Sequence, residues 1–180
     1  MAVRSSMTEL ITHLRLLAND QNSEEFSDQE LQDVLDQNAR IASYEQMTPI
    51  ENVTSNGVTE YKAFQSERLY FESDAKIYNT SYSELTPETS DFKLAYFTFS
   101  ASQNPPVLIY GWWYDINAAA ADVWELKASK YASLFDFDAD GGDYKLSQKA
   151  DAARKRAADF RAQSVTASQV TLIQRIDVAQ

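Results

Sequence analysis

Residues 111–148 read GWWYDINAAAADVWELKASKYASLFDFDADGGDYKLSQ, and they predict a long helix between an aromatic run and an aspartate-rich loop. Asp115 or Asn117 can cap this helix, because either side chain can accept a hydrogen bond from a first-turn N–H group. We expect the helix to continue to residue 135. Its apolar side chains share one stripe: Ile116, Ala119, Ala120, Val123, Trp124, Tyr131 and Leu134. Consecutive alanines allow close backbone approach, so we expect this helix to be the most buried one.

The residues after the loop predict a second helix, 147–163, that is basic on its exposed side. Small and apolar residues recur at helical spacing and form its expected buried seam: Leu146, Ala150, Ala153, Ala157 and Phe160. Its cations outnumber Asp151 and Asp159 and leave a positive surface: Lys149, Arg154, Lys155, Arg156 and Arg161. We expect this basic face to contact an acidic surface of a partner.

Two further helices are predicted before the long one, over residues 8–17 and 28–44. Ser27 and Glu30 have the spacing of a capping box, and Phe26 stands where a hydrophobic staple would pack on Leu31. The second helix is expected to bury one row of side chains: Leu31, Val34, Leu35 and Ile41.

Residues 50–112 differ in character from the helical segments. They are rich in Thr, Ser, Tyr, Phe and Val, with a turn signal at Asn56-Gly57, and they predict a small inserted antiparallel sheet or set of hairpins. Such hairpins can serve packing alone, or offer edges that neighbouring chains augment. The expected fold is α+β: an antiparallel bundle of about four helices with this insertion, forming one domain over residues 1–164. Residues 165–180 are expected to form an extended C-terminal interaction arm.

Composition limits the function classes. The chain has 180 residues, 44% of them hydrophobic, which suffices for a real core. It has no cysteine, so disulfides, thiolate zinc sites and cysteine nucleophiles are excluded. The net charge is −11, and residues 1–60 hold three basic against eleven acidic side chains. That balance opposes tight nonspecific nucleic-acid binding. The first residues carry an apolar run too short and too charged for a membrane span, so we expect a soluble chain and no membrane partner.

The aspartate-rich loop is the weak candidate for a metal site. Asp136, Asp138, Asp140 and Gly141 match the opening of a calcium-binding loop, but Ser147 stands where the bidentate glutamate belongs. The other interpretation is a loop whose acids stabilise the N-terminus of the following helix.

No catalytic constellation is visible in the sequence. His13 is the only histidine, and a boundary position on a helix explains it. The run Trp112-Trp113-Tyr114 can stack sugars or bases, but its place between a strand and a helix favours core filling. We therefore expect no enzyme activity and no cofactor.

The order of several segments resembles the head–tail connector adaptors of tailed bacteriophages. The resemblance rests on LITHLRLLAND followed by FSDQELQDVLDQ, on VLIYGWWYDINAAAADVWELKA, on the loop FDFDADGGDY, and on the LSQK entry into a basic helix. These segments cover about half of the chain.

This resemblance implies a virion neck protein, assembled in the host cytoplasm as a homo-oligomeric ring of about twelve copies. The ring would bind the portal protein on one side and a downstream neck or tail-terminator protein on the other. Genomic DNA would pass through its channel without sequence-specific binding.

Electrostatics and patterning assign roles to residues within this picture. The channel-facing candidates are Asp136, Asp138, Asp140 and Asp143 or, alternatively, acids of the N-terminal third, because repeated negative charge repels the duplex and leaves it free to slide. The partner-binding candidates are the basic residues of helix 147–163, expected to dock on the portal, and the apolar residues of the arm: Val170, Leu172, Ile176 and Val178. The alternatives are a calcium- or carbohydrate-binding module of a tail or baseplate, and a small hydrolase built on scattered carboxylates.

Overall fold

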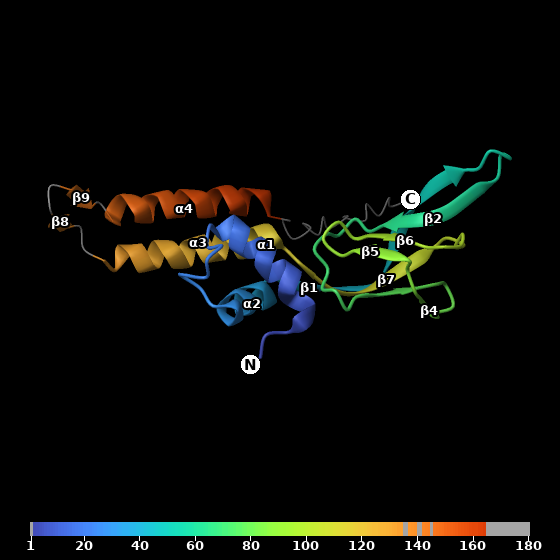
Figure 1. The fold of residues 1–180 in the computed structure, drawn as a ribbon, viewed down its shortest axis with the longest axis horizontal. Helices are drawn as coiled ribbons and strands as arrows, with labels where there is room; N and C mark the ends of the chain where they lie inside the picture. Colours follow the sequence, from blue (N-terminus) through green and yellow to red (C-terminus); the bar gives the residue numbers. More distant parts are fainter. Residues whose placement is uncertain (1, 135–136, 140–141, 145, 165–180) are drawn as a thin grey trace, which may run out of the picture.

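The chain is elongated, with its helices gathered in one half and its sheet in the other (Figure 1). The computed structural model describes residues 2–134, 137–139, 142–144 and 146–164. The helices are a 3-10 turn at Ser5–Met7, α1 Thr8–Ala18, α2 Asp28–Gln37, α3 Ile116–Ala132 and α4 Leu146–Gln163. The strands are β1 Ala39–Val53, β2 Thr59–Gln65, β3 Lys76–Tyr78, β4 Glu84–Leu85, β5 Thr89–Asp91, β6 Tyr96–Thr98, β7 Val107–Tyr114, β8 Phe137–Ala139 and β9 Gly142–Tyr144.

The helical half is a hairpin of α3 and α4 covered by the short helices α1 and α2. The capping box that begins α2 is confirmed, since the Ser27 side chain accepts from Glu30 N–H and the Glu30 carboxylate accepts from Ser27 N–H. Asp115 caps α3 by accepting a hydrogen bond from the N–H of Ala118. The core of this half is built mainly from leucines and alanines: Leu10, Leu14, Leu31, Leu35, Ala119, Ala120 and Val123 are all buried.

The other half is one seven-stranded antiparallel sheet curved into a half-barrel, in the order β4-β3-β7-β1-β2-β6-β5. Its concave side holds a second core: Met47, Phe64, Phe71, Ile77, Phe97, Phe99, Val107, Ile109 and Trp113. Gly111 is required here by close approach, because a Cβ at this position would lie 2.5 Å from the Cβ of Ala75.

The predicted four-helix bundle with a small inserted sheet is wrong, because the sheet is the larger architectural unit and has a core of its own. The second helix ends at Gln37, not at residue 44, and Asn38 caps it by donating to the carbonyl of Val34 and the carboxylate of Asp122. Residues from Ala39 onward pair with β7 instead. Ile41, expected in the helical core, therefore lies exposed on β1.

β1 and β7 connect the two halves physically. β1 follows α2 directly, β7 leads directly into α3, and Ala39 pairs with Tyr114 at their shared end. At the other end of the sheet, β1 and β2 continue as a two-stranded hairpin whose apolar residues Val53 and Val58 are exposed (Figure 1). The far turn of the α3–α4 hairpin carries the strand pair β8–β9.

Candidate partner-binding surfaces

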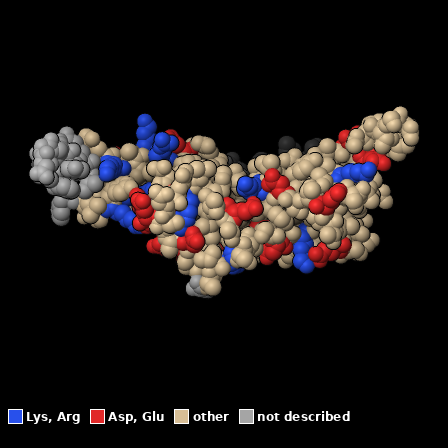
Figure 2. All heavy atoms as spheres, in the orientation of Figure 1, with Lys and Arg blue, Asp and Glu red and all other residues tan. Residues whose placement is uncertain are grey.

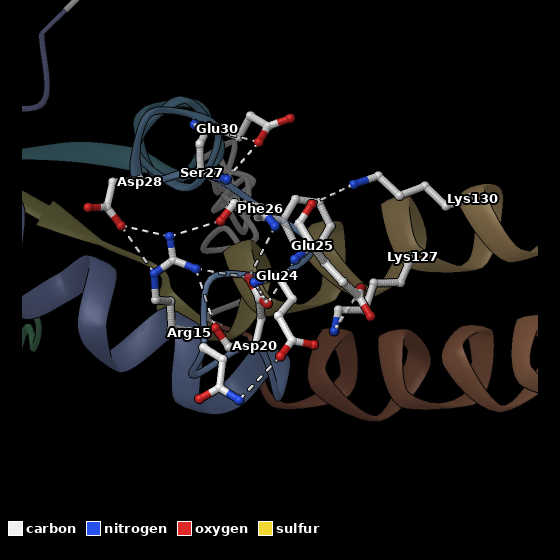
Figure 3. A network of polar contacts seen from close by, with 11 residues as sticks. Arg15, Asp20, Glu24, Glu25, Phe26, Ser27, Asp28, Glu30, Lys127 and Lys130 are labelled. Atoms are coloured by element: carbon white, nitrogen blue, oxygen red, sulfur yellow. Dashed lines mark hydrogen bonds and ion pairs between the residues drawn. The ribbon is translucent and has the colours of Figure 1, made fainter.

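The loop between α1 and α2 is held by a buried carboxylate (Figure 3). Asp20 accepts hydrogen bonds from the backbone N–H groups of Glu24, Glu25 and Phe26 at 3.0, 3.0 and 3.1 Å. Its side chain, 2% exposed, also pairs with Arg15 at 2.9 Å. Buried charges of this kind are tolerated only when they are paired and hydrogen-bonded. Asp20 and Arg15 therefore serve the fold.

Two lysines of α3 fasten the same loop to the long helix. Lys127 is 2% exposed, lies 3.1 Å from the carboxylate of Glu25, and has its ammonium 5.0 Å from the ring centre of Trp124. Lys130 donates to the Glu25 carbonyl at 2.8 Å and sits 3.9 Å from the ring centre of Phe26. Burial and the hydrogen bond to the Glu25 carboxylate raise the pKa of Tyr131 to about 12. Lys127, Lys130 and Tyr131 are thus each bound to Glu25 of the same chain.

A second polar network lies where the helices meet the sheet. The Glu72 carboxylate accepts from the Ser6 hydroxyl, from the Tyr114 hydroxyl at 2.7 Å and from Arg4 Nε at 2.9 Å. Arg4 also donates to both carboxylate oxygens of Asp36. Burial opposes ionisation of Glu72, but these hydrogen bonds outweigh it and hold its pKa below the ordinary value. Burial and the neighbouring Glu72 carboxylate raise the pKa of Tyr114.

This network borders a surface groove of about 600 Å³, which we call the acidic groove. Its lining residues are Arg4, Asp36, Ala39, Glu72, Asp74, Trp112 and Tyr114. Three carboxylates and one guanidinium give these side chains a formal charge of −2. Asp74 and Trp112 are exposed, the latter by 46%. The groove can therefore accept a cation beside an aromatic ring, where ring and carboxylate both favour positive charge.

The convex side of the sheet carries a cluster of aromatic rings, which we call the aromatic face and define as Tyr44, Tyr78, Tyr82, Tyr110 and Trp112. The ring of Tyr44 lies 5.2, 5.0 and 5.1 Å from the rings of Tyr78, Tyr82 and Tyr110. Trp112 stands two residues beyond Tyr110 on β7 and therefore on the same side of the sheet. The aromatic face thus runs into the acidic groove through Trp112.

Local backbone geometry aims two of these rings. Tyr44 is the extra residue of a β-bulge between Ser43 and Glu45, and its φ of 54° lies in the left-handed region. Tyr82 has a φ of 58° in the turn that Asn79 closes by accepting from the N–H groups of Ser81 and Ser83. A bulky residue in this region costs about 1–2 kcal/mol. Bulges commonly re-aim a side chain, and strain of this kind gathers at functional positions.

The predicted basic face of α4 is present, but its cations differ in their contacts. Arg161 pairs with Asp122 and Glu125 of α3 at 2.9 and 2.8 Å, and Arg154 pairs with Asp151 on its own helix. The remaining three are exposed and make no ion pair within the described part of the chain: Lys149, Lys155 and Arg156. Figure 2 shows Lys and Arg side chains over the helical half with some Asp and Glu among them, and both kinds over the middle and the sheet.

Several predicted site residues cannot be placed by their side chains. The arm 165–180, with Val170, Leu172, Ile176 and Val178, lies outside the described residues, as do Asp136 and Asp140. Only the backbone of Asp138, in β8, and of Asp143, in β9, is described. Among described residues, no group of three or more His, Cys, Asp or Glu side chains could hold a metal ion.

His13 stacks on Tyr70 with ring centres 5.4 Å apart, and burial and the charge of Lys93 lower its pKa. In the predicted aromatic run, Trp113 and Tyr114 fill the core as expected, whereas Trp112 points outward. The sequence reasoning missed the aromatic face altogether. The pattern of residues 28–44 favours a helix that includes Tyr44, the centre of the cluster. In the strand that forms instead, Ile41 pairs with Trp112 and Tyr44 lies near Tyr110.

Comparisons with known proteins return no matching family model, no similar curated protein and no similar solved structure. Among the helices described, none combines the length and the apolar character needed to cross a membrane.

Proposed function

We propose that this chain is a structural subunit of the head–tail connector of a tailed bacteriophage, an adaptor that assembles into a ring under the portal. In this proposal the ring contacts the portal protein on one side and a downstream neck or tail-terminator protein on the other. It forms part of the channel through which the genome passes.

The observation that carries the proposal is the placement of exposed contact surfaces in both halves of an elongated chain. The sheet half presents the aromatic face and the acidic groove, and the helical half presents unpaired cations on α4. Tyrosine and tryptophan are enriched at protein interfaces, and exposed apolar patches commonly mark binding surfaces. Because a ring subunit needs two different faces that complement each other, this arrangement supports assembly.

The buried ionisable groups support the same conclusion. Asp20 and Arg15 bind backbone groups and each other, and Lys127 pairs with the Glu25 carboxylate, so all three fasten segments of the chain together. This arrangement holds the loop between α1 and α2 rigidly against α3, which suits a subunit that must keep its shape in a ring.

The acidic N-terminal third has a role in this proposal as well. Residues 1–60 carry a formal charge of −8. Repeated around a ring, acids that face the channel would repel the phosphate backbone and keep the duplex free to slide.

The test is co-expression with the portal protein encoded in the same genome, followed by size-exclusion chromatography with light scattering. We expect the two proteins to elute together in a complex containing many copies of this chain. The matched control omits the portal protein and shows whether copies associate alone. A chain that stays monomeric and elutes apart from the portal at all concentrations would refute the proposal.

The aromatic face also favours a second candidate, a carbohydrate-binding module of a tail or baseplate. Trp112 is exposed beside Asp36 and Asp74, so the groove offers a ring on which a sugar can stack and carboxylates that can accept hydrogen bonds from its hydroxyls. Calorimetric titration with oligosaccharides, and with calcium chloride for the aspartate-rich loop, separates the two. An adaptor gives no binding heat in either titration.

A further inference from the structure

We infer that the acidic groove and the adjoining aromatic face of one copy receive the basic face of α4 from the next copy. This inference rests on the proposed ring, and it names the contact that joins neighbouring subunits.

The receiving surface has features that the fold of the single chain does not require. The apolar core of the sheet lies on its concave side, whereas the tyrosine rings lie on the convex side. Tyr44 and Tyr82 both hold left-handed backbone conformations that bulky residues rarely adopt. These rings pack on one another, yet Tyr44 stays 39% and Tyr82 63% exposed. The strained conformations therefore hold much of both rings at the surface, where an external contact can cover them.

Charge identifies the occupant. The acidic groove carries a formal −2, and Asp74 is an exposed carboxylate for which the structure shows no ion pair among the described residues. A complementary surface must be positive and must carry aliphatic stems that can lie on aromatic rings. Lysine and arginine side chains satisfy both conditions.

The chain itself supplies such a surface on α4. Lys149 and Arg156 are seven residues apart and so lie on one side of the helix, and Lys155 lies roughly 100° further around it. The flank with Arg154 and Arg161 is already occupied by Asp151 and by α3. Lys149, Lys155 and Arg156 are exposed and make no ion pair among the described residues, so they are available to another copy.

The placement of the two surfaces dictates the kind of assembly. α4 belongs to the helical half and the aromatic face to the sheet half, so the donor and receiving surfaces of one copy lie apart (Figure 1). Each copy can then donate to one neighbour and receive from another. Such heterologous contacts close into a ring when the rotation between copies permits.

The absence of cysteine from the chain provides a direct test. The double variant Asp74→Cys/Arg156→Cys places one thiol on each surface and is oxidised in the complex with the portal protein and, separately, in the chain alone. We expect a ladder of disulfide-linked oligomers extending beyond the dimer. The matched control, Asp74→Cys/Arg154→Cys, moves the second thiol to the occupied flank of α4 and should give no ladder.

The outcomes separate this inference from the proposed function. A portal complex that forms without a ladder, or with the same ladder in the control, overturns the inference and leaves the adaptor role standing. Failure to form any complex refutes the adaptor role itself. Saturable sugar binding that Trp112→Ala abolishes, with no ladder, assigns the aromatic face to carbohydrate instead.

A second measurement checks the directionality. The receiving variant Asp74→Arg/Trp112→Ala keeps its α4 intact, and the donor variant Lys149→Glu/Lys155→Glu/Arg156→Glu keeps its acidic groove intact. Neither should form rings alone, whereas their mixture should form a dimer that cannot extend. A donor variant that still forms rings but no longer binds the portal would show that α4 docks on the portal, which contradicts the inference.

Discussion

Removing the charge of Asp20 should destabilise the fold far more than removing that of Asp28, although both carboxylates bind Arg15. Asp20 is 2% exposed and accepts three backbone N–H groups besides Arg15, whereas Asp28 is 59% exposed. In Asp20→Asn an NH2 group replaces one carboxylate oxygen and faces N–H donors. Because both groups are donors, the hydrogen bonds of that oxygen are lost. Breaking a buried pair in this way costs about 3–5 kcal/mol.

The control Asp28→Asn loses a partly solvated ion pair, worth about 0–1 kcal/mol, and a favourable charge at the start of α2, worth about 0.3–1 kcal/mol. Urea unfolding measures both variants, and the comparison is valid when the slope of free energy against denaturant is unchanged. Equal losses for the two variants, or a loss below about 1 kcal/mol for Asp20→Asn, would refute the assignment of Asp20 as the buried anchor of the loop.

Three further predictions follow from particular contacts. Hydrogen bonds depress the pKa of Glu72. Its contribution to stability is therefore full above the ordinary carboxyl pKa of about 4.3 and is lost as pH falls through the lower folded value. The stability advantage of the wild type over Glu72→Gln, measured by urea unfolding at several pH values, should shrink in that acidic window and stay constant near neutrality. Gly111→Ala should lower the free energy of unfolding by about 1–3 kcal/mol, because its Cβ is forced against Ala75. Gly57→Ala has nothing within 4 Å of its Cβ and should cost only the left-handed backbone penalty of about 1 kcal/mol. Thermal unfolding compares the two variants, and equal losses of stability would contradict the close approach at Gly111. Deleting residues 165–180 should weaken assembly with the portal protein while leaving the melting temperature nearly unchanged, and a collapse of that temperature would place the segment in the core.

Local signals predict where the helices begin to within one residue. The Ser27–Glu30 capping box, the Asp115 cap and the buried alanines of α4 all depend on residues close together in sequence. Propensity and spacing are sufficient for such features because their contacts lie within one or two turns.

The start of β1 could not be predicted in the same way. The helical spacing of Val34 and Ile41, seven residues apart, favours a continuing helix, but Ala39–Ser43 pairs with β7, far along the chain. That pairing is a tertiary contact which overrides local preference. The aromatic face depends on the same pairing and on the bulge at Tyr44. It therefore cannot be predicted from local sequence without knowing that β1 pairs with β7.

The most direct test of the whole account is the number of copies in the complex with the portal protein, measured by native mass spectrometry. We expect a discrete particle that contains a ring of about twelve copies of this 20.4 kDa chain, matching the symmetry expected of the portal. A chain that remains a single copy in the presence of the portal, or that binds a small ligand or turns over a substrate only as a monomer, would contradict it.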